Sequence, residues 1–120
     1  MAVQETNLLI IQGATYTKVF TSLDSAGDPI NLTGCDIRMQ FRQHFDDVAS
    51  LYDASLTIGN IAVVSAAAGT YRLTIPATAT DDFTFCNAVW DVLLEQSGGV
   101  ITRLEKGRVD VSLTATRGDI

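Results

Sequence analysis

The sequence is poor in the residues on which most enzymes and metal sites depend. It has one histidine, His44, and two cysteines, Cys35 and Cys86, among 120 residues. Neither they nor the acidic residues have a metal-ligand spacing, and the chain has no phosphate-binding glycine loop and no nucleophile elbow. We therefore expect no catalytic residue, no cofactor-binding residue and no metal site, and we interpret His44 as a solvated loop residue.

Charged residues are also scarce, at 18% of the chain against the usual quarter or so. The net charge is −6, and the eight basic residues are scattered along the sequence: Lys18, Arg38, Arg42, Arg72, Arg103, Lys106, Arg108 and Arg117. Nucleic acids and anionic membranes attract concentrated positive charge, so we expect the protein to bind neither. The low charge content indicates that a partner covers part of the surface.

Long hydrophobic runs are absent as well. The uncharged stretch Ala54–Tyr71 is broken by Ser, Thr, Gly and Asn, which makes it too polar for a membrane span. The apolar run Leu8–Ile11 is far too short for a signal peptide. We expect a soluble protein made in the cytoplasm and folded as a single domain over residues 1–120.

The two cysteines stand at the start of predicted strands. By the parity of side chains along a strand, Cys35 shares a face with Ile37, and Cys86 shares a face with Trp90. Without an export signal, this position favours two buried free thiols over a disulfide bond.

Three short patterns are better explained by structure than by function. Asp46, Asp47 and Asp53 lack the spacing of a calcium loop, so we interpret them as solvated acids. The glycosylation sequon at Asn31-Leu32-Thr33 is better explained as a set of turn-forming residues. The integrin-type tripeptide Arg117-Gly118-Asp119 is a short match near a chain end, and we interpret it as chance.

What the sequence does have is strict two-residue alternation of apolar and polar side chains. In "DIRMQFRQ", residues 36–43, the apolar side chains are Ile37, Met39 and Phe41. The same period recurs in three further segments, with these apolar positions: Tyr71, Leu73 and Ile75; Ala88, Trp90, Val92 and Leu94; Val109, Val111 and Leu113. Alternation of this kind predicts half-buried β-strands.

Turn residues separate these strands. Gly27, Gly34 and Ser97–Val100 mark reversals, and Gly59-Asn60 predicts a two-residue hairpin between its flanking strands. Gly107 predicts a bulge or a bend inside the last strand. Thr80 before Asp81 and Asp82 predicts the cap and first turn of a short helix. The segment Arg42–Leu56 fits either a helical turn or two strands with an insertion.

About seven short strands with turns every eight to twelve residues are typical of an all-β antiparallel sandwich, here with one short helical turn. The strict period also fixes the register of each strand. A slip by one residue in Asp36–Gln43 turns three apolar side chains outward and buries two arginines.

The order of phrases along the chain resembles that of small virion proteins of tailed bacteriophages, of the kind found as the N-terminal module of baseplate upper proteins. The phrases are "IQGATYTKVF" (11–20), "DSAGDPINLTG" (24–34), "IRMQFR" (37–42), "GTYRLTIPATAT" (69–80), "VWDVLLE" (89–95) and "GGVITRLEKGRVDVS" (98–112). The sequence departs from the family where Asn87–Trp90 replace a Gly-x-Tyr, and in the acidic insertion "QHFDDVASLYD", Gln43–Asp53.

The resemblance implies an immunoglobulin-like sandwich without catalytic residues. It implies a structural protein that connects or decorates the baseplate or the tail-fibre attachment of a virion assembled in the host cytoplasm. The expected partners are other virion proteins, with copies repeated as a homo-oligomer or symmetric array.

Two alternatives remain open at this point. A capsid cement protein over the head lattice would have the same fold and the same lack of chemistry. A carbohydrate-binding module would need exposed aromatic side chains in a line, which Tyr16, Tyr52, Tyr71 and Trp90 do not form by parity.

Overall fold

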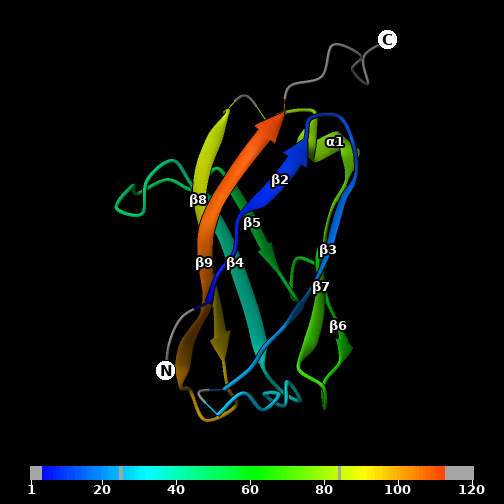
Figure 1. The fold of residues 1–120 in the computed structure, drawn as a ribbon, viewed down its shortest axis with the longest axis vertical. Helices are drawn as coiled ribbons and strands as arrows, with labels where there is room; N and C mark the ends of the chain where they lie inside the picture. Colours follow the sequence, from blue (N-terminus) through cyan, green and yellow to red (C-terminus); the bar gives the residue numbers. More distant parts are fainter. Residues whose placement is uncertain (1–3, 25, 84, 113–120) are drawn as a thin grey trace.

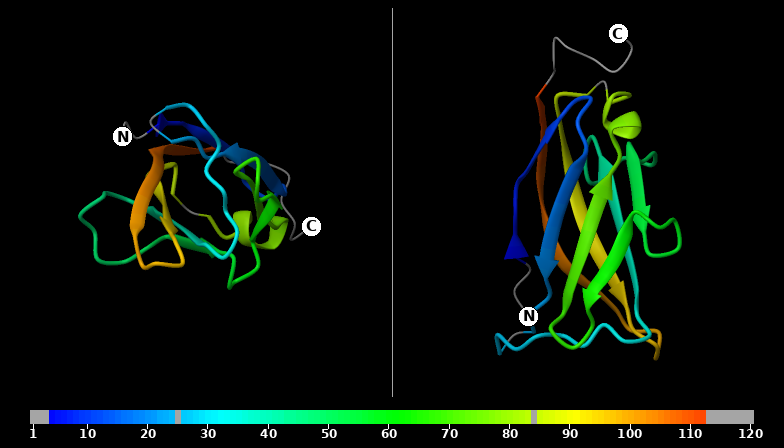
Figure 2. Two further views of the ribbon diagram at one scale, coloured as in Figure 1. Left: turned by 90° about the horizontal axis from the view of Figure 1, so that it is seen from below. Right: turned by 90° about the vertical axis from the view of Figure 1, so that its right-hand side faces the viewer.

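The protein consists of two β-sheets that face each other (Figures 1 and 2). The computed structural model describes residues 4–24, 26–83 and 85–112. Sheet A has the order β1-β9-β8-β4-β5, with β2 also paired to β9, and sheet B has the order β3-β7-β6. The strands of sheet A are β1 (Gln4–Glu5), β2 (Leu8–Ile11), β4 (Asp36–Arg42), β5 (Tyr52–Ser55), β8 (Asn87–Glu95) and β9 (Ile101–Ser112). Those of sheet B are β3 (Tyr16–Thr21), β6 (Ile61–Ser65) and β7 (Thr70–Ile75), and the short helix α1 is Ala77–Thr80.

The core lies between the sheets and contains the apolar side chains that the alternation predicts. Ile37, Met39 and Phe41 of β4 are buried, as are all four predicted apolar residues of β8 and all three of β7. The rings of Phe20 in sheet B and Trp90 in sheet A meet across the core, with their centroids 5.6 Å apart. Each such side chain contributes about 1.5–3 kcal/mol by its burial, which fixes the register of its strand.

The residues that the structure describes form nine strands rather than about seven, and these are not all antiparallel. β1 and β2 run parallel to β9 at one edge of sheet A. Leu8 and Ile10 of β2 are buried, whereas Leu9 and Ile11 are exposed. The sequence shows only a run of four apolar residues here. It carries no signal for which of them are buried or for the direction of the neighbouring strand.

The predicted hairpin at Gly59-Asn60 is wrong, because the strands on either side belong to different sheets. β5 pairs with β4 in sheet A, and β6 pairs with β7 in sheet B. The Asn60 side chain instead ties the crossing segment to β5. Its Oδ1 accepts a hydrogen bond from the backbone N–H of Ser55 at 2.9 Å, and its Nδ2 donates to the hydroxyl of Tyr52 at 2.9 Å.

The predicted helix start at Thr80 is also wrong. α1 begins after Pro76, and Thr80 is its last residue, so Asp81 and Asp82 follow the helix rather than open it. The buried hydroxyl of Thr80 donates to the carbonyl of Ala14 at 2.8 Å and accepts from the N–H of Gly13 at 3.1 Å. Thr80 thus holds the turn that leads into β3.

Gly107 lies in a regular part of β9, opposite Trp90, and the bulge that we predicted there lies instead at Leu104. A Cβ at position 107 would lie 1.9 Å from the carbonyl oxygen of Thr6. The indole Nε1 of Trp90 donates to the same oxygen at 2.9 Å. Glycine is therefore needed here for the close approach of another backbone segment, not for a bulge.

The prediction of two buried thiols is wrong for Cys86, which is exposed, while Cys35 is half-buried and packs on the core. The two cysteines are unpaired and lie at opposite ends of sheet A. Asp36, next to Cys35, is opposite Glu95 in the antiparallel pair of β4 and β8. Cys86 is therefore about nine residues, or roughly 30 Å, away along β8, several times the reach of a disulfide.

Several turn predictions are confirmed. Gly27 and Gly34 have positive φ angles of 86° and 72°. Asn31 accepts a hydrogen bond from the N–H of Thr33 at 2.9 Å, as an Asx turn does. In the Ser97–Val100 reversal, the N–H of Gln96 donates to the carbonyl of Val100 at 2.9 Å. The predicted core residue Leu113 and the tripeptide at 117–119 lie outside the described residues.

Candidate interaction surface

The outer face of sheet A gathers most of the basic residues that are scattered in the sequence. Arg38 and Arg42 project from β4, and Arg103, Lys106 and Arg108 project from β9. They share one face because their partners across β8 are Val89, Asp91 and Leu93, which alternate with the buried side chains of that strand. The strand register therefore concentrates charge that no sequence pattern groups.

Acidic side chains balance these bases. Arg38 pairs with Glu95 at 3.3 Å, and Arg103 pairs with Asp91 at 3.3 Å. Lys106 pairs with Glu5 at 3.8 Å and Arg108 with Asp110 at 3.5 Å. Exposed pairs of this kind stabilise a fold by about 0–1 kcal/mol each. Their effect is a surface on which positive and negative side chains alternate.

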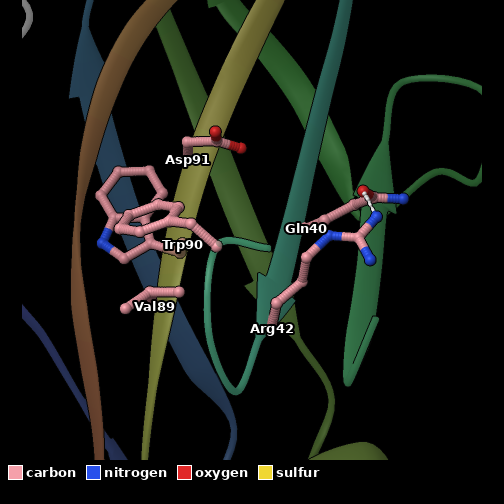
Figure 3. A pocket seen from close by; sticks show the side chains of 6 residues that line it. Gln40, Arg42, Val89, Trp90 and Asp91 are labelled. Atoms are coloured by element: carbon pink, nitrogen blue, oxygen red, sulfur yellow. Dashed lines mark hydrogen bonds between the residues drawn. The ribbon is translucent and has the colours of Figure 1, made fainter. Parts of the chain in front are cut away.

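Arg42 fixes the acidic insertion against this face. Its Nη1 donates to the carbonyls of Asp47 at 2.9 Å and Val48 at 2.7 Å. Its Nη2 donates to Oε1 of Gln40 at 2.6 Å (Figure 3). The N–H of His44 donates to the carboxylate of Asp47 at 3.0 Å. Residues 43–51 are thus a tethered loop that leads into β5, which answers the question that the sequence left open for this segment.

The tethered loop presents apolar side chains to solvent. Val48 is 98% exposed and Phe45 is 51% exposed. The Phe45 ring lies 5.9 Å from the guanidinium carbon of Arg103, in a cation–π contact. Phe45 lines two hollows in the face, one of about 40 Å³ beside Gln40 and one of about 260 Å³ beside Lys106 and Arg108.

Figure 3 shows the smaller hollow between β4 and β8. Gln40 and Arg42 lie on one side of it, and Val89 and Asp91 lie on the other. These side chains offer a guanidinium, an amide, a carboxylate and an aliphatic group. Arg42 donates hydrogen bonds to Gln40 and to the loop, and Asp91 forms an ion pair with Arg103.

The residues that sequence reasoning singled out do not form a reactive group. The His44 side chain is largely exposed, and its Nδ1 lies 3.5 Å from Asp47. Within residues 4–24, 26–83 and 85–112, no three His, Cys or acidic side chains are placed to hold a metal ion. In the same part of the chain, no helix is long and apolar enough to cross a membrane.

The four aromatic residues considered for carbohydrate binding do not line a surface. Tyr71 and Trp90 are buried, and Tyr16 and Tyr52 are half-buried against the core. Sequence reasoning missed the exposed aromatic Phe45 and its anchor Arg42. The insertion was visible in the sequence, but nothing in its residues shows which carbonyls Arg42 binds.

No protein-family model matches the chain, and no curated protein sequence matches it. Among solved structures, the chain is similar to the N-terminal domain of phage TP901-1 ORF48, with a TM-score of 0.55 and 12% identity over 93% of this chain and 99% of that one. Two further structures are less similar. One comes from work on multimeric cell-adhesive interactions of VGSC beta subunits (TM-score 0.45, 9% identity, 93% of both chains). The other contains ICOS, ICOS-L and an anti-ICOS-L VNAR domain (TM-score 0.44, 10% identity, 93% of this chain and 56% of that one). At such identities the likeness is one of fold, and the chain shares a fold with a phage protein domain over almost its full length.

Proposed function

We propose that this protein is a non-enzymatic structural component of a tailed bacteriophage particle, placed at the baseplate or the tail-fibre attachment. The observation that carries the proposal is the fold similarity to the phage TP901-1 domain, which extends over 93% of this chain and 99% of that one. The family resemblance of the ordered phrases in the sequence points the same way, independently of the coordinates.

The strand order supports an immunoglobulin-like sandwich as the finer description of the fold. Sheet A places β9, β8, β4 and β5 side by side, and sheet B places β3, β7 and β6 side by side. These orders correspond to the GFCC′ and BED strands of an immunoglobulin variable-type domain, with β2 added beside the last strand. Such a domain offers broad sheet faces, which suit a protein whose task is contact.

The outer face of sheet A and its tethered loop are the proposed contact surface. Compensated charges confer specificity on a docking partner because each misplaced partner leaves ions unpaired. The exposed side chains of Phe45 and Val48 supply apolar area, and Arg42 holds their loop in place before contact, which lowers the entropy lost on docking. The proposed partners are other virion proteins and further copies of the chain in a symmetric array.

The location is tested on purified particles of the phage that encodes the chain. We expect gold-labelled antibody to mark the tail end and quantitative mass spectrometry to count a few to a few dozen copies per particle. Hundreds of copies on the head would indicate a capsid cement protein instead. Absence from the particles, or turnover of a substrate by the isolated chain, would refute the structural role.

The contact surface is tested by incorporation of variants into particles. We expect Val48→Glu to reduce incorporation several-fold, because it places a charge on the most exposed apolar residue of the loop. Val100→Glu is the matched control, since Val100 is also exposed but lies in the reversal between β8 and β9. Equal incorporation of both variants would exclude the loop as a contact.

A further inference from the structure

A groove of about 300 Å³ opens between the two sheets. It lies on the side where β3 and the β1–β2 segment run next to each other (Figure 2). Its lining residues come from β3 and the segment after it, from the link between β1 and β2, and from β9: Lys18, Val19, Phe20, Thr21, Leu23, Thr6 and Glu105. The groove lies away from the tethered loop and the outer face of sheet A, so the proposed docking surface does not account for it.

Both strands beside the groove have a free edge. Among the strands of the described residues, β3 pairs with β7 alone and β1 pairs with β9 alone. Within the described ranges, no backbone hydrogen bond joins β3 to β1 or β2. An unpaired edge offers its N–H and C=O groups to an added strand.

The floor of the groove holds a buried carboxylate. The bulge at Leu104 turns Glu105 toward the interior opposite Val92, and Glu105 is only 4% exposed. Its Oε2 accepts a hydrogen bond from the hydroxyl of Thr6 at 2.8 Å. Burial raises the pKa of Glu105, while the hydrogen bond from Thr6 and the charge of Lys18 lower it. A buried carboxylate that accepts a hydrogen bond from one side chain of the described residues is costly, because it retains further acceptor positions.

No neighbouring group in the described part of the chain completes the pairing of Glu105. Lys18 comes from β3, but its ammonium lies over the Phe20 ring, 5.6 Å from the centroid, and forms no ion pair within 4.0 Å. The buried hydroxyl of Tyr71 has no hydrogen-bond partner among the residues that the structure describes. The pKa of Tyr71 is raised by burial and by the charge of Glu105. The groove thus places the apolar side chains of Val19, Phe20 and Leu23 beside a buried carboxylate that an external hydrogen-bond donor would satisfy.

We propose that this groove accepts an extended strand from a partner protein, which pairs with the free edge of β3 and places one Lys or Arg side chain against Glu105. The stem of such a side chain would pack on Val19, Phe20 and Leu23, and its charged head would donate to the carboxylate. The net charge of −6 also favours a basic partner at long range. Lys18 competes for the same carboxylate and so limits the affinity.

The test uses a blocked peptide, Thr-Val-Lys-Val-Thr, with its norleucine analogue as the control without charge. Fluorescence of Trp90 is the readout, because it is the only tryptophan and contacts both Phe20 and Thr6 beside the groove. We expect saturable binding of the Lys peptide. We expect the norleucine peptide to bind at least about tenfold more weakly, because it lacks the charged hydrogen bond to Glu105.

Two substitutions in the chain separate the proposal from a purely structural role of Glu105. We expect Glu105→Gln to weaken binding of the Lys peptide about tenfold or more, and Lys18→Met to strengthen it by removing the competing cation. Circular dichroism and urea unfolding of both variants show whether each is folded under the conditions of the titration. If Glu105→Gln does not fold, it is replaced by Glu105→Asp. Aspartate keeps the negative charge, but its shorter side chain holds the carboxylate farther from the bound peptide, so we expect weaker binding.

The proposal is overturned if the Lys peptide causes no saturable change at millimolar concentration, if the norleucine peptide binds equally well, or if Glu105→Gln binds unchanged. Binding of butylammonium ion, which has the charge of a Lys side chain but no peptide backbone, tests whether pairing of the peptide with β3 contributes to the affinity. Binding of this simple cation as tight as that of the peptide would also overturn the proposal, because the peptide backbone would then contribute nothing. These measurements use the isolated chain, so their outcome does not depend on where the protein lies in a particle.

Discussion

Replacing Gly107 by alanine tests the close contact that attaches the N-terminal segment to sheet A. The added Cβ would lie 1.9 Å from the carbonyl oxygen of Thr6 and 3.0 Å from the indole nitrogen of Trp90. Real Cβ atoms do not approach backbone oxygen so closely, so the segment at Thr6 must move away. The same movement would break the hydrogen bond from Trp90 Nε1 to Thr6, which is 2.9 Å long.

The size of the effect follows from these two contacts. A buried N–H donor left without a partner costs about 1–3 kcal/mol. Forcing an extra methyl into a packed site costs a further 1–3 kcal/mol or so. Because the segment relaxes in part, we expect the free energy of unfolding to fall by about 2–4 kcal/mol, a large share of the roughly 5–15 kcal/mol that stabilises an ordinary domain.

Urea unfolding followed by Trp90 fluorescence measures this change, and Gly98→Ala is the matched control. A Cβ at Gly98 meets nothing within 4 Å, so we expect its unfolding free energy to change by no more than about 0.5 kcal/mol. Glycine within a strand is ordinarily unfavourable by about 0.5–1 kcal/mol relative to alanine. If Gly107→Ala is as stable as the unmodified protein or more stable, Thr6 does not approach Gly107 and the reasoning is wrong.

Three further predictions concern the loop, the buried acid and the thiols. Arg42→Met removes the hydrogen bonds to the loop carbonyls, so amide hydrogens of residues 43–51 should exchange faster and stability should fall by about 1–2 kcal/mol; exchange as slow as in the unmodified protein would contradict the tether. Burial raises the pKa of Glu105 above its ordinary value of 4.5, so the folded state binds the proton more tightly than the unfolded state. The corresponding stability is complete below pH 4.5 and is lost as the pH rises through the raised folded value, and Glu105→Gln should remove this slope from unfolding curves measured across that range; parallel slopes would show that another group is responsible. Cys86 should react with a thiol reagent at once in the native protein and Cys35 more slowly, and mild oxidation should give no internal disulfide on non-reducing mass analysis; a bridged monomer would contradict the separation of the two cysteines.

The sequence predicts a strand well where one face of the strand is buried and the other is exposed to solvent. The alternation of Ile37, Met39 and Phe41 is confirmed in β4, and that of Tyr71, Leu73 and Ile75 is confirmed in β7. A register error in such a strand exchanges its buried and exposed faces, so the pattern itself carries the information.

The sequence fails where the outcome depends on a distant segment. Gly59-Asn60 has the local chemistry of a hairpin, yet the chain crosses there to the other sheet. The local sequence predicts that Thr80 caps a helix and that Gly107 forms a bulge, and neither does so in the structure. Their actual roles are set by contacts with Ala14 and Thr6, which are more than sixty residues away.

By itself, the sequence determined a two-sheet β protein with identified core residues and turns, because side-chain burial along a strand has a period of two and turn residues act locally. Only the tertiary structure decided which surfaces these strands create. It brought Arg38, Arg103 and Arg108 onto one face and held the insertion against that face through Arg42. It also directed the Glu105 side chain toward the groove that lies between the free edges of β3 and β1. Strand order and direction decide these placements, and they arise from pairing between distant segments that no local pattern encodes.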